Sequence, residues 1–206
     1  MTNIYHITHI ENLPGIISAE GLLCDARKRE LASTPTGIAY ESLKEKRARK
    51  SVPCGPQGYV ADYVPFYFAP RSPMLYTISK GNIPGRKEAD IIYLVSSVES
   101  VSERKLGCVF CDGHPIIAIT SFFDELNDLG KIDWELMEAI YWYDSVDDPD
   151  RSRRRQAEFL VHDFFPWELV IGIAVKNEGV RSRVNELLSG WGKQPEVVIK
   201  RGWYYG

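Results

Sequence analysis

The stretch DYVPFYFAPRSPM, residues 62–74, is the most specific segment of the chain and the one that indicates its fold. Its apolar and aromatic first half predicts a β-strand over residues 64–68. Because side chains alternate between the two faces of a strand, Phe66 and Phe68 should fill the core. Tyr67 alternates with them and should face away from the core, toward a cleft.

The second half of this stretch predicts a turn from a strand into a helix. Pro65 and Pro70 mark the ends of the strand or an edge of the sheet, and Pro73 suits the first turn of a helix. The first backbone N–H groups of a helix have no partner within the helix, so they attract anions. Arg71 and the helix start at Ser72 are therefore candidates for holding a phosphate.

Two further segments carry polar residues beside apolar strands. Residues 3–8 predict a short strand with His6 and Thr8 on one face. A histidine beside a core strand is most often a structural residue. Glu158 stands at the mouth of an apolar strand over residues 158–161, where a carboxylate is costly to bury without a partner. It is either a residue at the surface end of a strand or a carboxylate held against a sugar hydroxyl.

The remaining pattern predicts strands scattered along the chain with helices at the periphery, which is typical of one α+β domain over residues 1–206. The other expected elements are a helix from residue 11 that Gly21 ends, a loop over 24–37, a charged helix over 40–50, a strand over 91–96, weaker strands at 109–110 and 116–120, acidic helices over 122–129 and 133–141, a strand over 169–175, a helix over 180–188 and a strand over 196–199.

Length and composition indicate a folded protein with a buried core and no membrane-spanning helix. The chain has 206 residues, of which 44% are hydrophobic, and this is enough to bury a core. It has no apolar run of about 18 residues, so we expect no membrane-spanning helix. The first residues lack the basic-then-apolar layout of a signal peptide, and a cytoplasmic location is the default expectation.

The net charge of −3 conceals a strong charge pattern. Residues 27–50 hold eight Lys or Arg and three Glu, whereas residues 121–150 hold ten Asp or Glu and one Lys. Four arginines then follow within residues 151–155. Charge blocks are often solvated helix faces, but these two basic blocks flank the segments described above, which favours binding of a polyanion. The candidate contacts are Arg47, Arg49, Lys50 and Arg154, with Tyr40 available for base stacking.

Four cysteines raise the question of a metal site. Cys108 and Cys111 form a CxxC pair with His114 three residues further on, whereas Cys24 and Cys54 are isolated in the sequence. A structural zinc site normally has four ligands, so we expect thiols and no metal. A zinc-stabilised structural protein built on the CxxC pair and His114 remains an alternative.

Three segments together resemble one family, the DarT DNA ADP-ribosyltransferase toxins. They are YHITH at residues 5–9, the stretch at 62–74, and RQAEFLV at 155–161, and the likeness extends from residue 4 to residue 205 in the same order. The resemblance implies an ADP-ribosyltransferase fold with a central split β-sheet and peripheral helices. It also implies NAD as co-substrate, a base in single-stranded DNA as acceptor (thymine favoured over guanine), and a macrodomain antitoxin that removes the mark.

By position, the resemblance implies roles for individual residues. Glu158 matches the catalytic glutamate, Arg47 an arginine of the active-site loop, and His6 the histidine that binds NAD. The full set expected to bind the cofactor is His6, Thr8, Tyr67, Arg71 and Ser72. Residues 81–90 and 144–150 follow no pattern of the family, so the DNA sequence preference stays open. Two alternatives remain: a protein or RNA acceptor, and a nucleic-acid-binding module with an inactive NAD site.

Overall fold

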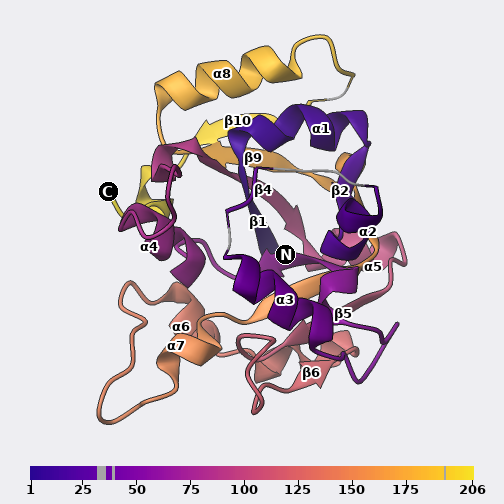
Figure 1. Cartoon of the computed structure of the whole chain (residues 1–206), viewed down its shortest axis with the longest axis vertical. Coiled ribbons are helices and arrows are strands. Elements are labelled where there is room, and N and C mark those ends of the chain that lie inside the picture. The colour runs from indigo at the N-terminus through magenta and orange to yellow at the C-terminus, as the bar shows by residue number, and fades with distance from the viewer. Residues whose placement is uncertain (32–35, 39, 193) are drawn as a thin grey trace.

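An eight-stranded mixed sheet forms the centre of the computed structural model, which describes residues 1–31, 36–38, 40–192 and 194–206 (Figure 1). Strands β9 and β10 are parallel and the other neighbours are antiparallel. In spatial order the strands are β10 (Glu196–Ile199), β9 (Gly172–Val175), β4 (Ile91–Ser97), β1 (Asn3–His9), β3 (Tyr63–Tyr67), β7 (Glu158–His162), β5 (Cys108–Cys111) and β6 (Phe122–Phe123). A small second sheet pairs β2 (Gly21–Leu23) with β8 (Phe164–Pro166).

The large sheet is split between β1 and β3. β1 pairs with β4 along its whole length, and β3 pairs likewise with β7. Between β1 and β3, Tyr5 and Tyr67 are the one directly opposed pair among the described residues. The Pro65 carbonyl faces His6 of β1, and the N–H and C=O of a strand residue point to the same side. The missing N–H of Pro65 therefore faces the split, where β3 loses no hydrogen bond to β7.

Helices cover the two faces of the sheet unequally. Apolar residues of α1, α5 and α8 pack in one core with Phe66 and Phe159, while α4 and the aromatic tail around Tyr204 pack on the other face with Tyr93. Figure 1 shows α8 beside β10, with β6 and α7 toward the opposite end. The helices are α1 (Leu13–Ser18), α2 (Asp25–Glu30), α3 (Glu41–Arg49), α4 (Pro73–Ser79), α5 (Val98–Glu103), α6 (Trp134–Glu138), α7 (Arg151–Arg154) and α8 (Glu178–Leu188). Within the described ranges, none is long and apolar enough to cross a membrane.

The predicted α+β class, with a central split sheet and peripheral helices, is confirmed. The alternation in the segment over residues 62–74 is also confirmed, because Phe66 and Phe68 are buried in the core and Tyr67 lines a cavity on the other side. Ser72 caps α4 and Pro73 begins it, as the sequence indicated.

Two predictions near the N-terminus were wrong. Residues 24–37 were expected to form a loop, but α2 begins after Cys24, whose thiol accepts a hydrogen bond from the Arg27 N–H; residues 32–35 lie outside the described part of the chain. Gly21 does not end α1. Glu20 takes the left-handed conformation with φ of 56°, and Gly21 already belongs to β2.

The region between β5 and α7 also differs from the prediction. Phe122 and Phe123 form a strand rather than a helix, because they pair with Cys111 and Phe110 at the sheet edge. The Phe123 ring stacks on that of Phe110. The expected helix over 133–141 ends at residue 138, and residues 116–120 form turns instead of a strand. At Phe122 and Phe123, pairing with β5 therefore outweighs local propensity.

Candidate active site

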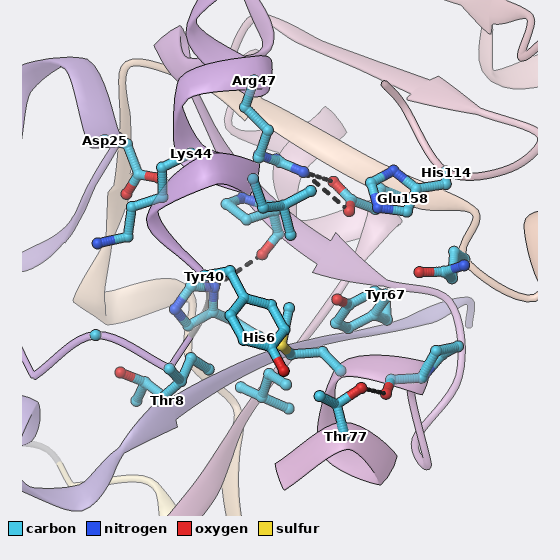
Figure 2. A pocket seen from close by; sticks show the side chains of 18 of the residues that line it. His6, Thr8, Asp25, Tyr40, Lys44, Arg47, Tyr67, Thr77, His114 and Glu158 are labelled. Atoms are coloured by element: carbon cyan, nitrogen blue, oxygen red, sulfur yellow. Dashed lines mark hydrogen bonds and ion pairs between the residues drawn. The ribbon is translucent and has the colours of Figure 1, made fainter. Parts of the chain in front are cut away.

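A cavity of about 330 Å³ lies at the split in the sheet, within the size range of ligand sites (Figure 2). Its central side chains come from five separate parts of the chain, so that the site exists only in the folded protein. Its central residues are His6 and Thr8 from β1, Tyr67 from β3, Arg47 from α3, Glu158 from β7 and His114 from the loop after β5.

The Arg47–Glu158 ion pair is the main polar feature of this cavity. Nη1 of Arg47 donates to both carboxylate oxygens of Glu158, at 3.1 and 3.0 Å. The two residues are 8% and 4% exposed, so water screens the pair little. Burial raises the pKa of Glu158 while the guanidinium opposes this rise. Burial also acts against the charge of Arg47, but Glu158 outweighs it and raises the pKa of Arg47.

Glu158 lies directly opposite Tyr67 in the pairing of β7 with β3. This register places the carboxylate and the phenol side by side at the same end of two central strands. Burial, followed by the charge of Glu158, raises the pKa of the Tyr67 hydroxyl, so this group stays protonated. A neutral aromatic ring beside a carboxylate offers a flat surface to a ligand that approaches Glu158.

His6 is held as a neutral imidazole. Its Nδ1 lies 2.8 Å from the carbonyl oxygen of Pro65, and a carbonyl can only accept, so Nδ1 carries the proton. Burial lowers the pKa of His6 to about 4, which keeps the ring uncharged at neutral pH. Nε2 is therefore left as an acceptor, suited to a hydroxyl group of a ligand.

A second cavity of about 460 Å³ continues from the first one. The two share His6, Thr8, Asn12, Lys28 and Thr36 along their common border. Asn12 organises this border: its amide donates to the hydroxyl of Thr8 at 3.1 Å and accepts from the backbone N–H of Thr36 at 2.7 Å. Two joined cavities suit a long ligand made of two parts.

His114 is a site residue that the sequence analysis considered only as a metal ligand. Its Nδ1 accepts from the Ile116 N–H at 3.4 Å, which leaves Nε2–H as a donor. Burial lowers its pKa to about 4, helped by the charges of Arg47 and Lys46. Figure 2 shows the ring close to the Glu158 carboxylate. Asp25 and Lys28 were missed because the helix α2 that carries them was predicted as a loop.

Arg71 and Ser72 are not among the residues that line the two cavities, although Ser72 directly precedes Pro73, which lines the first one. The Ser72 hydroxyl accepts from the Leu75 N–H at 3.2 Å and is occupied as the cap of α4. Arg71 has a left-handed backbone with φ of 58°, and its guanidinium packs 4.5 Å from the centre of the Tyr205 ring. Both residues therefore make contacts within the strand-to-helix turn. Neither lines either cavity, where it could hold a phosphate of the ligand.

The arginine run over residues 151–155 is not the free basic patch that the sequence suggested. Arg154, expected to contact DNA, pairs with Asp133 at 2.6 Å and with Asp148 at 2.5 Å. Arg153 pairs with Asp150 and Asp112. Arg155 is buried and donates to backbone carbonyls. The acidic block that precedes the run neutralises much of its charge.

The basic residues of α3 are placed differently. Arg49 is exposed, and the Lys50 ammonium lies 5.9 Å from the centre of the Phe122 ring. Tyr40 stands before the first turn of α3, lines the cavity, and donates its hydroxyl to the carbonyl of Asn82 at 2.9 Å. Arg49 and Lys50 therefore lie on or next to the helix that brings Arg47 into the cavity.

The four cysteines are free thiols. Cys111 is fully buried and its thiol donates to the carbonyl of Gly113. In the part of the chain that the structure describes, no group of three or more His, Cys, Asp or Glu side chains could hold a metal ion.

A split sheet with a histidine on β1, a tyrosine on the adjacent strand β3 and a glutamate on the next strand, β7, is the arrangement of an ADP-ribosyltransferase. The family model of the ssDNA thymidine ADP-ribosyltransferase DarT matches residues 5–205. The chain belongs to this family. It is an NAD-dependent DNA ADP-ribosyltransferase.

Individual relatives agree with this assignment. The DNA ADP-ribosyl transferase of Thermus sp. (strain 2.9) is 42% identical, over 99% of this chain and 96% of that protein. The structure of Thermus sp. 2.9 DarT in complex with ADP-ribosylated ssDNA has a TM-score of 0.92 at 40% identity, covering 99% and 96% of the two chains. The same protein in complex with NAD+ has a TM-score of 0.87 at 39% identity, covering 99% and 98%.

A more distant relative joins two activities in one chain. It is a DNA ADP-ribosyl transferase–DNA ADP-ribosyl glycohydrolase fusion protein of Thermosipho africanus, 24% identical over 90% of this chain. The match covers 45% of that protein, so this chain corresponds to only part of it.

Proposed function

We propose that the cavity at the split transfers ADP-ribose from NAD+ to a thymine base of single-stranded DNA, with Glu158 and Arg47 as the catalytic residues. The observation that carries this proposal is the buried ion pair between these two residues, which lies beside Tyr67 in the cavity at the split. Residues 1–206 would form the single domain that performs the reaction.

The site has unused polar atoms that fit such a ligand. Nη2 of Arg47 is buried and, among the described residues, has no hydrogen-bond partner. A buried unpaired donor is costly, so this atom indicates a position where a ligand oxygen belongs. Nε2 of His6 is an acceptor at the border of the two cavities. A donor in one cavity and an acceptor at its far edge match the hydroxyl and carbonyl groups of NAD+ and a base.

Glu158 would act at the bond that is broken. NAD+ supplies the ADP-ribose, and positive charge develops on the ribose carbon as nicotinamide departs. The buried Glu158 carboxylate, held against the ribose 2′-hydroxyl, would stabilise this charge electrostatically. Arg47 holds the carboxylate in one orientation through two hydrogen bonds, so little rearrangement is needed during the reaction.

Arg47 would act on the acceptor base as well. The ring N–H of thymine is a weak acid, and its nitrogen becomes a good nucleophile only as that proton leaves. A guanidinium whose Nη2 is free can stabilise the negative charge that results. Glu158 would help to remove the proton, and His114 offers a further N–H donor to a base carbonyl. Positioning NAD+ and the base in line contributes in addition.

His6, Thr8 and Tyr67 would bind the co-substrate. The neutral His6 ring would accept from a ribose hydroxyl, and the Tyr67 ring would pack against nicotinamide. Lys28 lies at the border of the two cavities and offers a positive charge to the diphosphate. On the acceptor side, Arg49 and Lys50 would follow the DNA backbone while Tyr40 stacks on a base.

The test is the intact mass of a short single-stranded oligonucleotide after incubation with the protein and NAD+. The wild type should add one ADP-ribose to a thymine-containing strand. The Glu158→Ala variant should lose transfer by about a hundredfold or more, because the developing charge is no longer stabilised. Glu168→Ala, which removes an exposed glutamate paired with Arg104, is the matched control and should transfer normally.

Near-normal transfer by Glu158→Ala would overturn the role of Glu158. A mass gain on protein or RNA, and none on any single-stranded DNA, would overturn the assignment of single-stranded DNA as the acceptor. Varying the oligonucleotide sequence then maps the base and the neighbouring nucleotides.

The proposed function includes a partner protein that removes the ADP-ribose from DNA. The Thermosipho africanus relative carries a DNA ADP-ribosyl glycohydrolase in the same chain. We propose that the present protein is the toxin of a toxin–antitoxin pair, acts on DNA in the cytoplasm, and is countered by a separate macrodomain antitoxin that removes ADP-ribose. Modified oligonucleotide should regain its original mass when such a glycohydrolase is added.

A further inference from the structure

We propose that Tyr205 is a positioning residue for the DNA acceptor, because its hydroxyl links residues 139–150 to the turn between β3 and α4. Residues 139–150 connect α6 to α7 and run along the side of the molecule on which α4 lies (Figure 1). The inference rests on the proposed function, since it concerns how this segment meets single-stranded DNA.

The Tyr205 hydroxyl stands at the junction of two segments. It donates to the backbone carbonyl of Arg71 and accepts from the indole N–H of Trp142 at 2.9 Å. The rings of Tyr205 and Trp142 both pack edge-on against Tyr76 of α4, at 5.1 and 5.7 Å between ring centres. The Arg71 guanidinium covers the face of the Tyr205 ring. A single hydroxyl therefore joins the C-terminal tail, the β3–α4 turn and the middle of the 139–150 segment.

The tail that carries Tyr205 is itself fixed to the sheet. Buried Glu88 accepts from the Tyr205 backbone N–H at 2.6 Å and from the Gly206 N–H at 3.3 Å. Lys176 holds the same carboxylate at 2.7 Å. Tyr204 is buried, and its hydroxyl donates to the Ile91 carbonyl at 3.0 Å. The hydroxyl of Tyr205 therefore projects from a tail that these contacts fix to the rest of the protein.

The two ends of the segment are held independently. Arg155 donates to the last carbonyls of α6, those of Leu136 and Met137, and to the carbonyl of Pro70. At the other end, Arg154 pairs with Asp148 at 2.5 Å. Between these contacts, Trp142 is the residue of the segment that reaches α4 and the tail.

The fixed segment exposes aromatic surface. Tyr141 and Tyr143 are 70% and 63% exposed, and their ring centres lie 6.0 Å apart. Both flank Trp142, which points to the protein. Their segment packs through Trp142 on α4, a helix that contributes Pro73 and Thr77 to the lining of the cavity, so exposed tyrosines here suit stacking on the bases that flank the modified one. Asp148 and Asp150 would repel DNA if free, but arginines of α7 neutralise them.

Kinetics on the full chain test the link. Tyr205→Phe keeps the ring and removes the hydroxyl, and we expect the KM for single-stranded DNA to rise about tenfold, the size expected from losing one or two neutral hydrogen bonds. The KM for NAD+ and kcat at saturating DNA should change less than twofold. Tyr204→Phe is the matched control: it removes a buried hydroxyl one residue away that has no contact with residues 139–150.

A second readout does not depend on activity. Limited proteolysis with chymotrypsin should cut Tyr205→Phe faster than Tyr204→Phe at Tyr141 and Tyr143, because the released segment samples more open conformations. Trp142→Phe should match Tyr205→Phe in both assays, and the double variant should be no worse than either single one.

The outcomes separate this inference from the proposed function. If the wild type modifies DNA and Tyr205→Phe behaves like Tyr204→Phe in KM and in proteolysis, the positioning role is overturned while the function stands. If the wild type modifies no DNA, the proposed function fails. The link between Tyr205 and residues 139–150 is then judged by proteolysis alone, and equal rates for Tyr205→Phe and Tyr204→Phe would refute it. Additive effects of Trp142→Phe and Tyr205→Phe would show that the two residues act separately.

Discussion

The Arg47–Glu158 pair contributes little to the stability of the fold and is better suited to the proposed reaction. Each charge is buried, and burying an ion pair gains little free energy because desolvation offsets the attraction. Arg47 also leaves one buried donor unpaired within the described part of the chain. A pair of this kind is better explained by what it does to a ligand than by what it adds to the fold.

Replacing Arg47 by lysine tests this view. Lysine keeps the charge, but with a single nitrogen it cannot hold both carboxylate oxygens, as Nη1 does, and also present a second nitrogen, as Nη2 does, to a ligand. We expect Arg47→Lys to lower the rate of ADP-ribose transfer about 100-fold, the usual cost of losing one donor that stabilises developing charge. Arg49→Lys, on the exposed side of the same helix, should transfer at the wild-type rate. Initial rates at saturating NAD+ and DNA measure both, and equal rates would exclude a specific role for the guanidinium.

His6 gives a prediction for stability against pH. Its pKa is about 4 in the folded protein and 6.5 when unperturbed, so the unfolded chain binds the proton first. The stability that neutral His6 contributes is complete above pH 6.5 and is lost as the pH falls toward 4. Relative to His6→Gln, the wild type should lose roughly 2 kcal/mol more unfolding free energy between pH 7 and pH 5. Urea denaturation at the two pH values measures this, and parallel losses would contradict it.

Among the elements, the contact between β2 and β8 places Gly21 against another backbone. A Cβ added at Gly21 would lie 2.3 Å from the carbonyl oxygen of Phe165. Neither strand can move without disturbing Leu22 and Phe165, which are both buried in the core. The requirement for glycine here comes from close packing of the small second sheet, rather than from the end of a helix as the sequence suggested.

Two glycine substitutions separate these explanations. Gly21→Ala should destabilise the protein by roughly 1–3 kcal/mol, because overpacking forces the backbone apart. Gly15→Ala in α1 meets no atom within 4 Å and should stabilise it by up to about 1 kcal/mol, since alanine favours the helix. Chemical denaturation of the two variants beside the wild type provides the values. Equal stability of Gly21→Ala and the wild type would show that the sheet yields at this position.

An element of this fold could be predicted from the sequence where its residues carry a local pattern of their own. The strand over residues 64–68 and the helix that Pro73 begins carry their own pattern, and both were found. α2 was missed because it is short and polar, so its stability comes from the Cys24 cap and from packing. The role of the arginine run depends on aspartates at positions 112 and 133, which only the fold brings near. Pairing between distant segments leaves no local trace in a sequence.

For the molecule as a whole, the distribution of charge should determine which part of the surface binds DNA. The net charge is −3, so attraction must come from a local surface, and α3 with its flanks carries exposed basic residues while the arginine run is paired. The slope of log affinity against log salt counts the phosphate contacts, at about 0.7 per contact for a single strand.

Arg49→Ala should therefore reduce the magnitude of this slope by about 0.7, which corresponds to one phosphate contact. Arg181→Ala, on α8 beside β10 and paired with Glu178, should leave the slope unchanged. Fluorescence anisotropy of a labelled oligonucleotide across a salt series gives both slopes. A similar reduction in both variants would mean that DNA binding follows net charge and not the surface around α3.

The position of β7 in the sheet has a consequence for synthesis of the protein. β7 lies between β3 and β5, although both of these strands precede it in the chain, and it carries Glu158 at its first residue. A nascent chain that has not yet emerged past β7 has His6, Arg47 and Tyr67 but lacks Glu158, and its strands β3 and β5 are not yet joined by β7. With Glu158 as the proposed catalytic carboxylate, we expect an unfinished polypeptide on the ribosome to leave DNA unmodified until β7, which ends at residue 162 of the 206, has been made.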